Sequence, residues 1–356
     1  MKILILGGGF CGTAAAKLLE KKIPKAEITL IDKKSYFEFS PSIHKVAFDK
    51  KYFKKITIPY KNIFKRTKFI QDKIIEVSPY FVKTSKRIFS FDYLIICTGI
   101  KYPINLKNTK NVCPLKDFFE AAEMGVKIAS SKRILVIGGG LIGTEIAGEL
   151  VTRTNIEVIL VHSSNRLLDR NPAKASKYAY DFLTKRGVKI IFNEKIVLHS
   201  DGYFITNTKR KIKAQVGLWC AGILPDASFM KEFGNLTDSK GFIKVNEFLQ
   251  LEKHKRIFVG GDINNVPEEK TAQNAERHAY VIAKNIITLV KNSSTHKQPI
   301  TYHKLLVFHN PRSGPLVISL GDWHGILSFK NFAWCGRIPG ILKHLIEWWV
   351  VEWKYS

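Results

Sequence analysis

Two glycine-rich turns, each between an apolar run and an expected helix, constrain the fold of this chain most strongly. Residues 7–12 read GGGFCG and follow the apolar residues 2–6, and residues 138–143 read GGGLIG and follow the apolar residues 133–137. Glycines in this pattern permit a tight turn and let the backbone approach a pyrophosphate at the N-terminus of the helix. We therefore expect an α/β fold with two Rossmann-like dinucleotide-binding domains. Two bound dinucleotides are most simply used to pass a hydride from one to the other.

The order of the expected strands and helices places the second of these domains inside the first. Residues 1–103 and 231–299 are predicted to form one dinucleotide-binding domain, and residues 104–230 the other. Residues 300–356 are rich in aromatic side chains and are unlike either domain. The two domains are thus a divergent internal duplication followed by a C-terminal segment.

The chain is strongly basic. Its 356 residues include 57 Lys and Arg against 30 Asp and Glu, which gives a formal net charge of +27. This balance favours anionic partners such as nucleic acid, an anionic membrane surface or phosphorylated cofactors. An ordinary solvated basic surface would explain it equally well.

The cysteine pattern argues against disulfide and metal chemistry. The five cysteines stand at positions 11, 97, 113, 220 and 335, and none of them forms a CxxC motif. We therefore expect no redox-active dithiol and no metal site, and the odd, scattered number suits a reducing compartment. The first apolar strand begins at residue 2 and no run of about 18 apolar residues occurs, so we expect neither a signal peptide nor a transmembrane helix.

The ends of the second strands suggest how each ribose is recognised. Asp32 follows Gly12 by 20 residues, and a carboxylate there can accept hydrogen bonds from ribose hydroxyls, although a strand-end turn residue is the alternative. The corresponding position of the second domain is His162, with Arg166 nearby. No carboxylate would then repel a 2′-phosphate, and Arg166 could pair with one. That His162 is merely a neutral polar residue at a strand end remains equally open.

Together with further motifs, these residues resemble a known family of flavoproteins with two dinucleotide-binding domains. Within that group the chain is most similar to the type II NADH:quinone oxidoreductases and the apoptosis-inducing-factor-like quinone reductases. The matching motifs cover about residues 1–290 and are Gly7-x-Gly9-x-x-Gly12 with Asp32, ICTG at 96–99, the second glycine turn with EIAGEL at 145–150, CAG at 220–222, the segment from Val245 to Asp262, and TAQ at 271–273.

The resemblance implies that FAD binds the first domain and that NADH or NADPH binds the second. No His or Cys stands in a recognised flavin-attachment motif, so FAD is expected to be non-covalent. The residues implied for FAD are Gly7, Gly9, Phe10, Gly12, Asp32, Lys33, Thr98, Gly99, Gly261, Asp262 and Ala272. Those implied for NAD(P)H are Gly138, Gly140, Ile142, Gly143, His162, Arg166 and Gly222.

The candidate catalytic residues are Glu145, Gln273 and Arg277. The resemblance implies that Glu145 lies on the nicotinamide side. In the quinone reductases an Ala-Gln-x-Ala-x-Gln segment lines the flavin and quinone pocket, and here residues 272–277 read AQNAER. Gln273 is kept, whereas Arg277 replaces the last glutamine. Arg277 could hydrogen-bond a quinone carbonyl, and a solvated arginine on the helix surface is the alternative.

The end of the chain has the pattern of an amphipathic helix. Residues 338–355 place Ile, Leu and three Trp on one broad stripe and Lys343, His344, Glu347 and Lys354 on the other side. Tryptophan and lysine beside apolar surface are typical of a helix in a bilayer surface. We expect residues 334–356 to bind an anionic membrane, peripherally and on its cytoplasmic side. A helix packed on the core, or on the partner in a homodimer, is the alternative.

These inferences predict a membrane-associated flavoprotein that transfers electrons from NADH, or NADPH, through FAD to a quinone. Because no cysteine pair is expected, reduced FAD would pass its electrons directly to the acceptor. One alternative is a soluble reductase with a protein or another small acceptor. Another is a basic flavoprotein whose main role is binding, although we expect no specific nucleic-acid partner.

Overall fold

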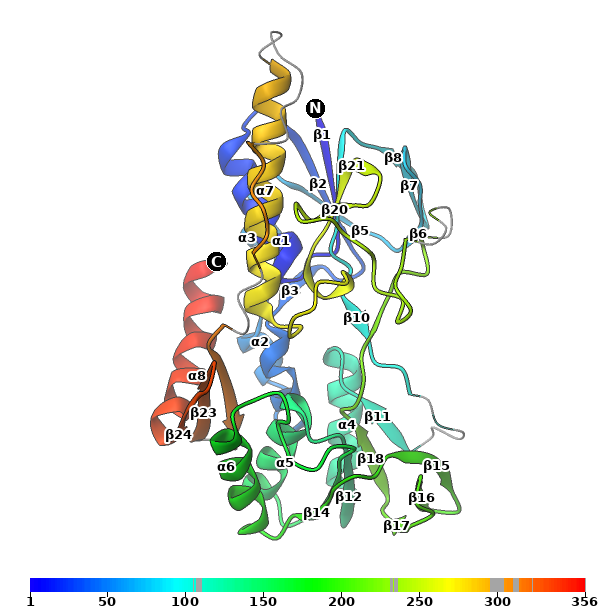
Figure 1. Ribbon diagram of the computed structural model, residues 1–356, viewed down its shortest axis with the longest axis vertical. Coiled ribbons are helices and arrows are strands. Elements are labelled where there is room, and N and C mark those ends of the chain that lie inside the picture. Colours follow the sequence, from blue (N-terminus) through cyan, green and yellow to red (C-terminus); the bar gives the residue numbers. More distant parts are fainter. Residues whose placement is uncertain are drawn as a thin grey trace.

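The computed structural model describes residues 1–104, 106, 111–230, 233, 236–294, 304–309, 314–321 and 323–355. These residues form two α/β halves and a C-terminal unit that lies against both (Figure 1). The first half is built on a six-stranded sheet of order β20-β21-β9-β1-β2-β5. Its strands are β1 (Lys2–Leu6), β2 (Glu27–Asp32), β5 (Lys68–Gln71), β9 (Tyr93–Ile96), β20 (Gln250–Leu251) and β21 (His254–Val259).

Helices α1 (Phe10–Lys22) and α7 (Ala272–Ser294) pack against each other beside this sheet. Strands β1, β2, β5, β9 and β21 run parallel, and only β20 is antiparallel to its neighbour. Parallel strands are covered on both faces, which explains why the runs in β1, β2 and β9 are apolar throughout rather than alternating. The chain returns to this sheet after residue 249, when β20 and β21 join it beside β9.

The second half contains a five-stranded parallel sheet of order β11-β18-β12-β13-β14. Its strands are β11 (Val112–Pro114), β12 (Arg133–Ile137), β13 (Glu157–Val161), β14 (Lys189–Ile191) and β18 (Val216–Trp219), and its helices are α4 (Phe118–Ala129), α5 (Leu141–Arg153) and α6 (Ala173–Thr184). Asp117 caps α4, because its carboxylate accepts from the backbone N–H groups of Phe119 and Glu120. The α/β fold with two Rossmann-like sheets is therefore confirmed.

Smaller elements are inserted in the two halves and connect them. The insertion after β2 holds β3 (Tyr36–Glu38), the 3₁₀ helix η1 (Ser40–Ala47), α2 (Tyr52–Lys55), β4 (Thr57–Pro59) and α3 (Tyr60–Ile63). Two antiparallel sheets follow, one of β6 (Ile74–Val77), β7 (Phe81–Thr84) and β8 (Ile88–Ser90), the other of β15 (Ile196–Ser200), β16 (Tyr203–Thr206) and β17 (Lys211–Lys213). Strands β10 (Ile100–Lys101) and β19 (Leu224–Pro225) pair where the chain crosses between the halves, and η3 (Gly261–Ile263) precedes α7.

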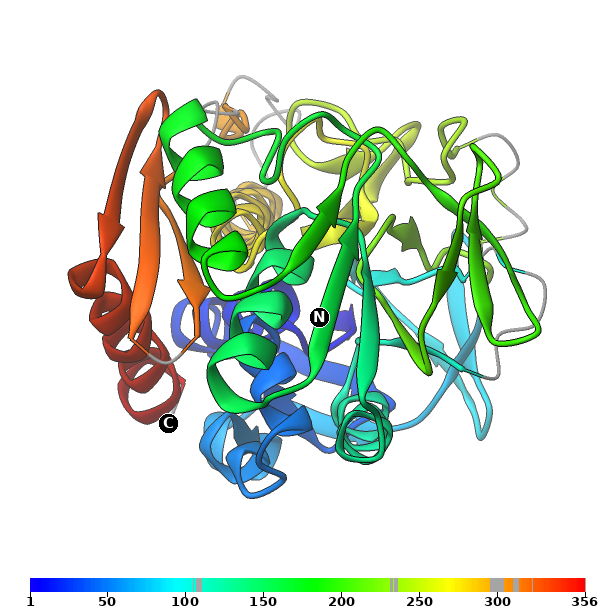
Figure 2. The same ribbon diagram turned by 90° about the horizontal axis from the view of Figure 1, so that it is seen from below.

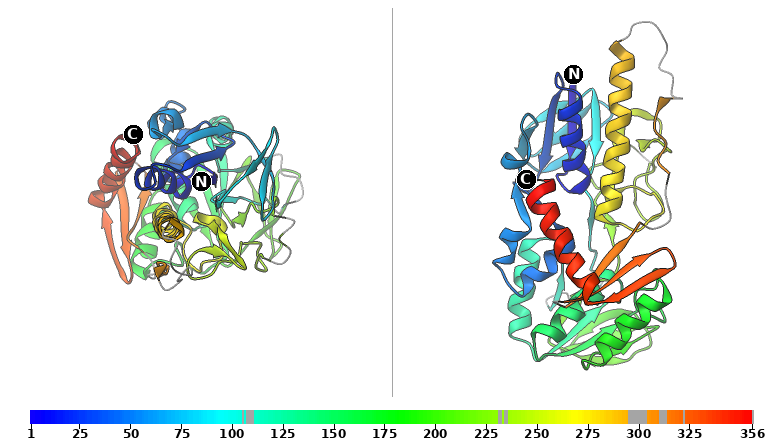
Figure 3. Two further views of the ribbon diagram at one scale, coloured as in Figure 1. Left: turned by 90° about the horizontal axis from the view of Figure 1, so that it is seen from above. Right: turned by 90° about the vertical axis from the view of Figure 1, so that its left-hand side faces the viewer.

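The C-terminal unit is an antiparallel sheet followed by a helix. Strands β22 (Leu316–Leu320), β23 (His324–Phe329) and β24 (Phe332–Gly336) lead into α8 (Arg337–Trp349) and the π-helical turn η5 (Val350–Lys354). The right-hand view of Figure 3 shows α8 running along the outside of the molecule past both halves. Helix α8 can lie close to the sheet because Gly340 has no side chain. A Cβ at this position would come within 2.4 Å of the Trp323 carbonyl oxygen.

Helix α8 turns its polar side toward the protein and its apolar side outward. Lys343 and Glu347 are buried, whereas the exposed fractions of Leu345, Trp348 and Trp353 are 55%, 55% and 69%. Ile338 and Ile341 continue the same outward stripe. This is the reverse of an ordinary amphipathic surface helix, whose apolar side faces the core. No helix among the described residues is both long and apolar enough to span a bilayer.

Three ion pairs hold the polar side of this C-terminal helix in place. Lys343 Nζ lies 3.1 Å from Glu145 Oε1 of α5, and Lys354 Nζ lies 2.5 Å from Glu276 Oε2 of α7. Glu347 Oε2 lies 3.2 Å from Lys45 Nζ of η1, and Glu347 also accepts hydrogen bonds from the hydroxyls of Ser42 and Tyr52. Burial alone would raise the pKa of the Glu347 carboxyl, but Lys45 and the two hydroxyls hold it below its usual value.

The last described residue, Tyr355, joins an aromatic cluster beside the first glycine turn. Its ring centroid lies 4.5 Å from that of Phe37 and 6.4 Å from that of Phe10, and its hydroxyl donates to Glu276. Phe10 and Phe37 themselves meet edge to face at 5.0 Å. The end of the chain therefore packs directly on the start of α1.

We expect Glu347→Ala to lower the free energy of unfolding by about 3 kcal/mol, because it leaves the Lys45 cation buried without its partner. The matched control is Glu352→Ala, which removes an exposed carboxylate from η5 and should change stability by less than about 0.5 kcal/mol. Urea denaturation of both variants measures the difference. Equal effects of the two substitutions would show that the Glu347 cluster contributes nothing to stability.

Candidate cofactor and acceptor site

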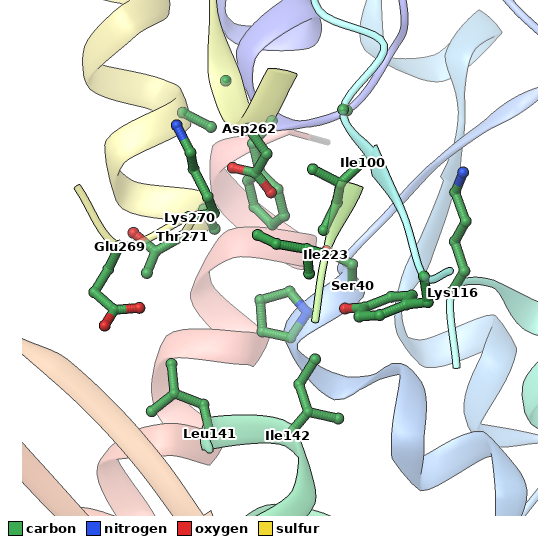
Figure 4. Close-up of a pocket in the computed structure, with 18 of the residues that line it drawn as sticks. Ser40, Ile100, Lys116, Leu141, Ile142, Ile223, Asp262, Glu269, Lys270 and Thr271 are labelled. Atoms are coloured by element: carbon green, nitrogen blue, oxygen red, sulfur yellow. The ribbon is translucent and has the colours of Figure 1, made fainter. Parts of the chain in front are cut away.

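A single cavity of about 1830 Å³ lies between the two halves and reaches the inner side of α8. Residues of both glycine turns line it, together with Lys343, Ile346 and Trp349 of the C-terminal helix. Figure 4 shows Asp262 of the first half and Ile142 of the second on opposite sides of the space, with Ile100 and Ile223 between them. The cavity thus brings the two predicted dinucleotide sites together.

The first glycine turn is open on the side that faces the cavity and closely packed on the side that faces β1. A Cβ added at Gly12 would lie 1.9 Å from the Gly7 carbonyl oxygen, so Gly12 allows α1 to approach β1. A Cβ added at Gly9 meets no atom within 4 Å. Asp32 Oδ2 accepts from the Gly8 N–H at 2.6 Å, which fixes its carboxylate beside the turn. This arrangement fits the pyrophosphate and ribose of a dinucleotide.

The second glycine turn repeats this geometry. A Cβ at Gly143 would lie 1.8 Å from the Gly138 carbonyl oxygen, whereas Gly140 is open on its cavity side. Six buried polar atoms of the cavity wall have no hydrogen-bond partner among the described residues: Glu38 Oε2, His44 Nε2, His162 Nε2, Glu194 Oε2, Trp219 Nε1 and Glu268 Oε2. Buried polar groups are rarely left unpaired, so these atoms too fit a site that holds a polar ligand.

His162 lies in the cavity wall beside the second glycine turn. Burial lowers the pKa of its imidazole, so the side chain is neutral at pH 7. Arg166 does not reach the cavity, because its guanidinium donates to the carbonyl oxygens of Asp169 and Asn171 at 2.5 and 3.0 Å. In this position the Arg166 guanidinium does not face the cavity, so the pairing of Arg166 with a phosphate stays a prediction that this geometry does not favour. The cation of this loop that lines the cavity is Arg170, which sequence reasoning missed.

Asp262 lies in the cavity wall at the start of η3. Burial raises the pKa of its carboxyl to about 6, with the Lys270 ammonium opposing that shift and Glu268 adding to it. The turn before it is held by His278, whose Nδ1 accepts from the Gly261 N–H at 3.0 Å while its Nε2 lies 3.0 Å from Glu268 Oε1. The sequence offered no sign of this pair, because Glu268 precedes the TAQ motif at residues 271–273 and His278 follows it.

Glu145 is also in the cavity wall, where α5 meets the C-terminal sheet. Its Oε1 accepts from the Ser319 N–H at 3.0 Å and lies 3.1 Å from Lys343 Nζ. Burial would raise the pKa of Glu145, but Lys343 and His44 lower it below the usual value, so the carboxylate is ionised. His44 and Lys343 both line the cavity, and neither was among the predicted site residues.

The two candidate residues at the start of α7 point in different directions. Gln273 is exposed to the cavity, whereas Arg277 is not among the residues that line it. The Arg277 guanidinium lies over the Phe308 ring, 5.8 Å from its centroid, and Nη2 lies 3.4 Å from the His309 carbonyl oxygen. The alternative of an arginine on the outer surface of the helix therefore fits the geometry better than a group that contacts the acceptor. Its neighbour Glu276 does line the cavity.

The remaining predicted residues lie at or directly behind the cavity wall. Those that line it are Gly7, Phe10, Lys33, Thr98, Gly99, Gly138, Ile142, Gly222, Gly261 and Ala272. Phe10 contributes mainly to the aromatic cluster with Phe37, and Lys33 Nζ lies 4.0 Å from Asp117 Oδ2.

Two cysteines that are far apart in the sequence meet beside the first glycine turn. Cys11 Sγ lies 3.2 Å from Cys97 Sγ, and both residues are buried. The absence of a CxxC motif had concealed this pair. Burial, with Cys97 next to it, raises the pKa of the Cys11 thiol well above its usual value, which opposes the thiolate that dithiol chemistry needs. Within the described ranges, no three His, Cys, Asp or Glu side chains are grouped as metal ligands would be.

Comparison with known proteins agrees with this geometry. The pyridine nucleotide-disulphide oxidoreductase family model matches residues 1–279. The chain belongs to this family. It is 32% identical over 378 residues to apoptosis-inducing factor homolog A of Dictyostelium discoideum, an alignment that covers 96% of this chain and 88% of that protein. The type II NADH:quinone oxidoreductase of Staphylococcus aureus is 24% identical over 390 residues, covering 97% and 94%.

The solved structure of NDH2 from Plasmodium falciparum in complex with NADH has the same fold. Its TM-score against this chain is 0.84 at 15% sequence identity, with 99% of this chain and 98% of that chain covered. The resemblance stated from the motifs is thus confirmed, and the protein is an oxidoreductase with FAD and NAD(P)H as cofactors.

Substitution of two glycines separates the ligand-facing side of the first turn from its packing side. Gly9→Ala should weaken FAD binding with little change in the stability of the FAD-free protein, because the added methyl projects into open space at a φ of −71°. Gly12→Ala should destabilise the FAD-free protein by about 3 kcal/mol or more, since backbone must move. FAD titration and urea denaturation measure the two effects. If Gly9→Ala bound FAD normally, the pyrophosphate would lie elsewhere.

Proposed function

We propose that this protein is a peripheral membrane NAD(P)H:quinone oxidoreductase. The observation that carries the proposal is the continuous cavity, which joins both glycine turns to the inner side of a helix whose outer side is apolar. A nucleotide donor and a lipid-soluble acceptor could enter such a cavity from different sides. The Staphylococcus aureus relative, named as a type II NADH:quinone oxidoreductase, supports the same assignment.

In this proposal the chain binds and orients the reactants rather than taking part covalently. FAD, when bound, supplies a two-electron carrier between donor and acceptor. The open sides of Gly9 and Gly140 would hold the two pyrophosphates, Asp32 and Asp262 would bind the FAD hydroxyl groups, and His162 would face the ribose of the donor. The walls of the cavity would exclude water and hold the reacting rings in contact.

The acceptor would approach along α8. Ile346, Trp349 and Val350 line the cavity, and Trp349 is also half exposed on the outer surface. A quinone with an apolar tail could therefore reach the cavity while its tail stayed in the lipid. Reduction of a quinone by NAD(P)H consumes one proton from solvent, and Glu276, paired with the partly exposed Lys354, lies in the wall through which such a proton could pass.

Membrane attachment is proposed through residues 334–356, on the cytoplasmic side of a membrane. The outward stripe of α8 exposes isoleucine, leucine and tryptophan side chains to water, which is costly unless another apolar phase covers them. Tryptophan side chains favour the membrane–water interface. Because Lys343 and Glu347 face the protein, this stripe can enter the lipid without carrying those charges with it.

The acceptor site is tested by separating the two half-reactions in anaerobic rapid mixing. NADH should bleach the flavin absorbance of wild-type protein, and a short-chain quinone should restore it. Gln273→Ala should slow the step with quinone by about 10-fold and leave bleaching by NADH nearly unchanged, because Gln273 lines the cavity. The control is Arg277→Ala, whose side chain lies over Phe308 and should affect neither step. Failure of every quinone to restore the flavin would refute quinone as the acceptor class.

We expect only modest discrimination between NADH and NADPH, because neutral His162 places no negative charge at the second ribose. The ratio of kcat/KM for the two donors, measured at one salt concentration, should stay below about 100-fold, or about 2.7 kcal/mol. His162→Glu should shift the preference toward NADH, whereas His162→Gln, which stays neutral, should not. A preference above this limit in wild-type protein would contradict the assignment.

Membrane attachment predicts that Trp348→Ser/Trp353→Ser releases the protein from lipid vesicles in a sedimentation assay. The control is Tyr80→Ser/Phe119→Ser, which removes two aromatic side chains that are 81% and 74% exposed elsewhere. Point substitutions are preferable to deletion of residues 334–356, which would leave Glu145 and Lys45 buried without the Lys343 and Glu347 charges that pair with them. A change in oligomeric state instead of vesicle binding would assign the stripe to a partner copy.

A further inference from the structure

The insertion between β3 and β5 concentrates positive charge to an unusual degree. Residues 48–68, named here the basic segment, contain eight Lys and Arg and a single acid, Asp49. All eight cations are exposed: Lys50, Lys51, Lys54, Lys55, Lys61, Lys65, Arg66 and Lys68. The cavity does not account for these cations, because none of the eight lines it.

The four lysines around α2 have no acidic partner among the described residues. Lys50, Lys51, Lys54 and Lys55 form no ion pair there, although Lys55 Nζ lies 5.5 Å from the centroid of the Tyr52 ring. Some cations of the second half are compensated instead, since Lys177, Lys189 and Arg133 each pair with a carboxylate. Uncompensated charge on one short segment is typical of a surface that meets an anionic partner.

The basic segment lies beside the apolar stripe of α8. The Tyr52 hydroxyl donates to Glu347 of α8, and Lys45, just before the segment, pairs with the same carboxylate. Figures 2 and 3 both show the α2 region next to the C-terminal helix. The uncompensated cations therefore lie on an element that contacts the C-terminal helix, from which Leu345 and Trp348 are exposed, rather than on a remote part of the molecule.

We propose that the basic segment binds the headgroups of anionic phospholipids and, with α8, forms a two-part membrane-docking surface. The inference rests on the membrane attachment proposed above and adds to it the element that selects anionic lipid. Apolar insertion and electrostatic attraction are the two signals that together give stable peripheral binding. A nucleic acid would match the charge, but it has no apolar surface with which to cover the neighbouring stripe.

Such a surface would also orient the protein on the bilayer. Ser40 and His44 of η1, immediately before the basic segment, line the cavity, as do Ile346 and Trp349 of α8. Contact with lipid through both the basic segment and the apolar stripe of α8 would hold the cavity entrance against the bilayer. Contact through α8 alone would leave the protein free to rotate about the helix axis.

The test compares two sets of four lysines in the full-length, FAD-loaded protein. One variant replaces Lys50, Lys51, Lys54 and Lys55 by Gln. The control makes the same change in net charge at Lys83, Lys209, Lys211 and Lys213, exposed residues outside the cavity lining in the β6–β8 and β15–β17 regions, on the opposite side of the molecule. Each is sedimented with phosphatidylcholine vesicles that contain or lack phosphatidylserine, over a range of salt concentrations.

We expect the basic-segment variant to bind phosphatidylserine vesicles about 30-fold more weakly than wild type, with a smaller salt dependence, and the control to bind nearly as wild type. Arginine at the same four positions should restore binding. NADH oxidation with a soluble short-chain quinone should be the same in all variants. Loss of that oxidation in every protein would refute the proposed reaction but leave the lipid result intact.

Three results would overturn the inference. The basic-segment variant could bind anionic vesicles as wild type does, or the control could lose binding equally, which would make overall charge responsible. The third is an unchanged affinity for vesicles together with a selective loss of binding to duplex DNA, which would assign the segment to nucleic acid.

Discussion

The burial of charge beneath α8 is the interaction on which the arrangement of the whole molecule depends. Lys343, Glu347 and Lys354 pair with residues of the second half, the β3–β5 insertion and α7, respectively. Removing an ion from water costs several kcal/mol, which only a well-placed partner of opposite charge offsets. Any rotation of α8 about its axis would separate these pairs together, so the helix is confined to one orientation, with its apolar side outward.

The same pairs make the C-terminal unit part of the cavity wall. Glu145, Lys343 and Glu276 each belong both to an ion pair under α8 and to the lining of the cavity. The two glycine turns have nearly the same geometry, so the two ends of the cavity differ in the residues around the turns. Asp32 and an aromatic cluster lie beside the first turn, and the neutral His162 lies beside the second. The two cofactor sites of an otherwise duplicated fold are thus distinguished by the positions at which its two copies differ.

The sequence predicted what depends on local pattern. The glycine turns, the strands before them and the position of His162 all follow from residues within one βαβ unit, and the structure has them as expected. It could not predict contacts between distant segments, such as Lys343 with Glu145, which lie 198 residues apart, or Cys11 with Cys97. The sequence could not show the directions of the Arg166 and Arg277 side chains for a related reason, since the direction of a side chain on a loop or helix depends on neighbours such as Phe308 that the motif does not contain.

The contact of Tyr355 with Phe10 and Phe37 has a consequence for the order of events during synthesis. Phe10 and Phe37 leave the ribosome early, whereas Tyr355 is translated more than 300 residues later. During most of translation, the residues beside the first glycine turn therefore lack the Tyr355 ring that packs on them in the complete protein. The C-terminal segment is therefore the last part of the chain to close this flank of the turn.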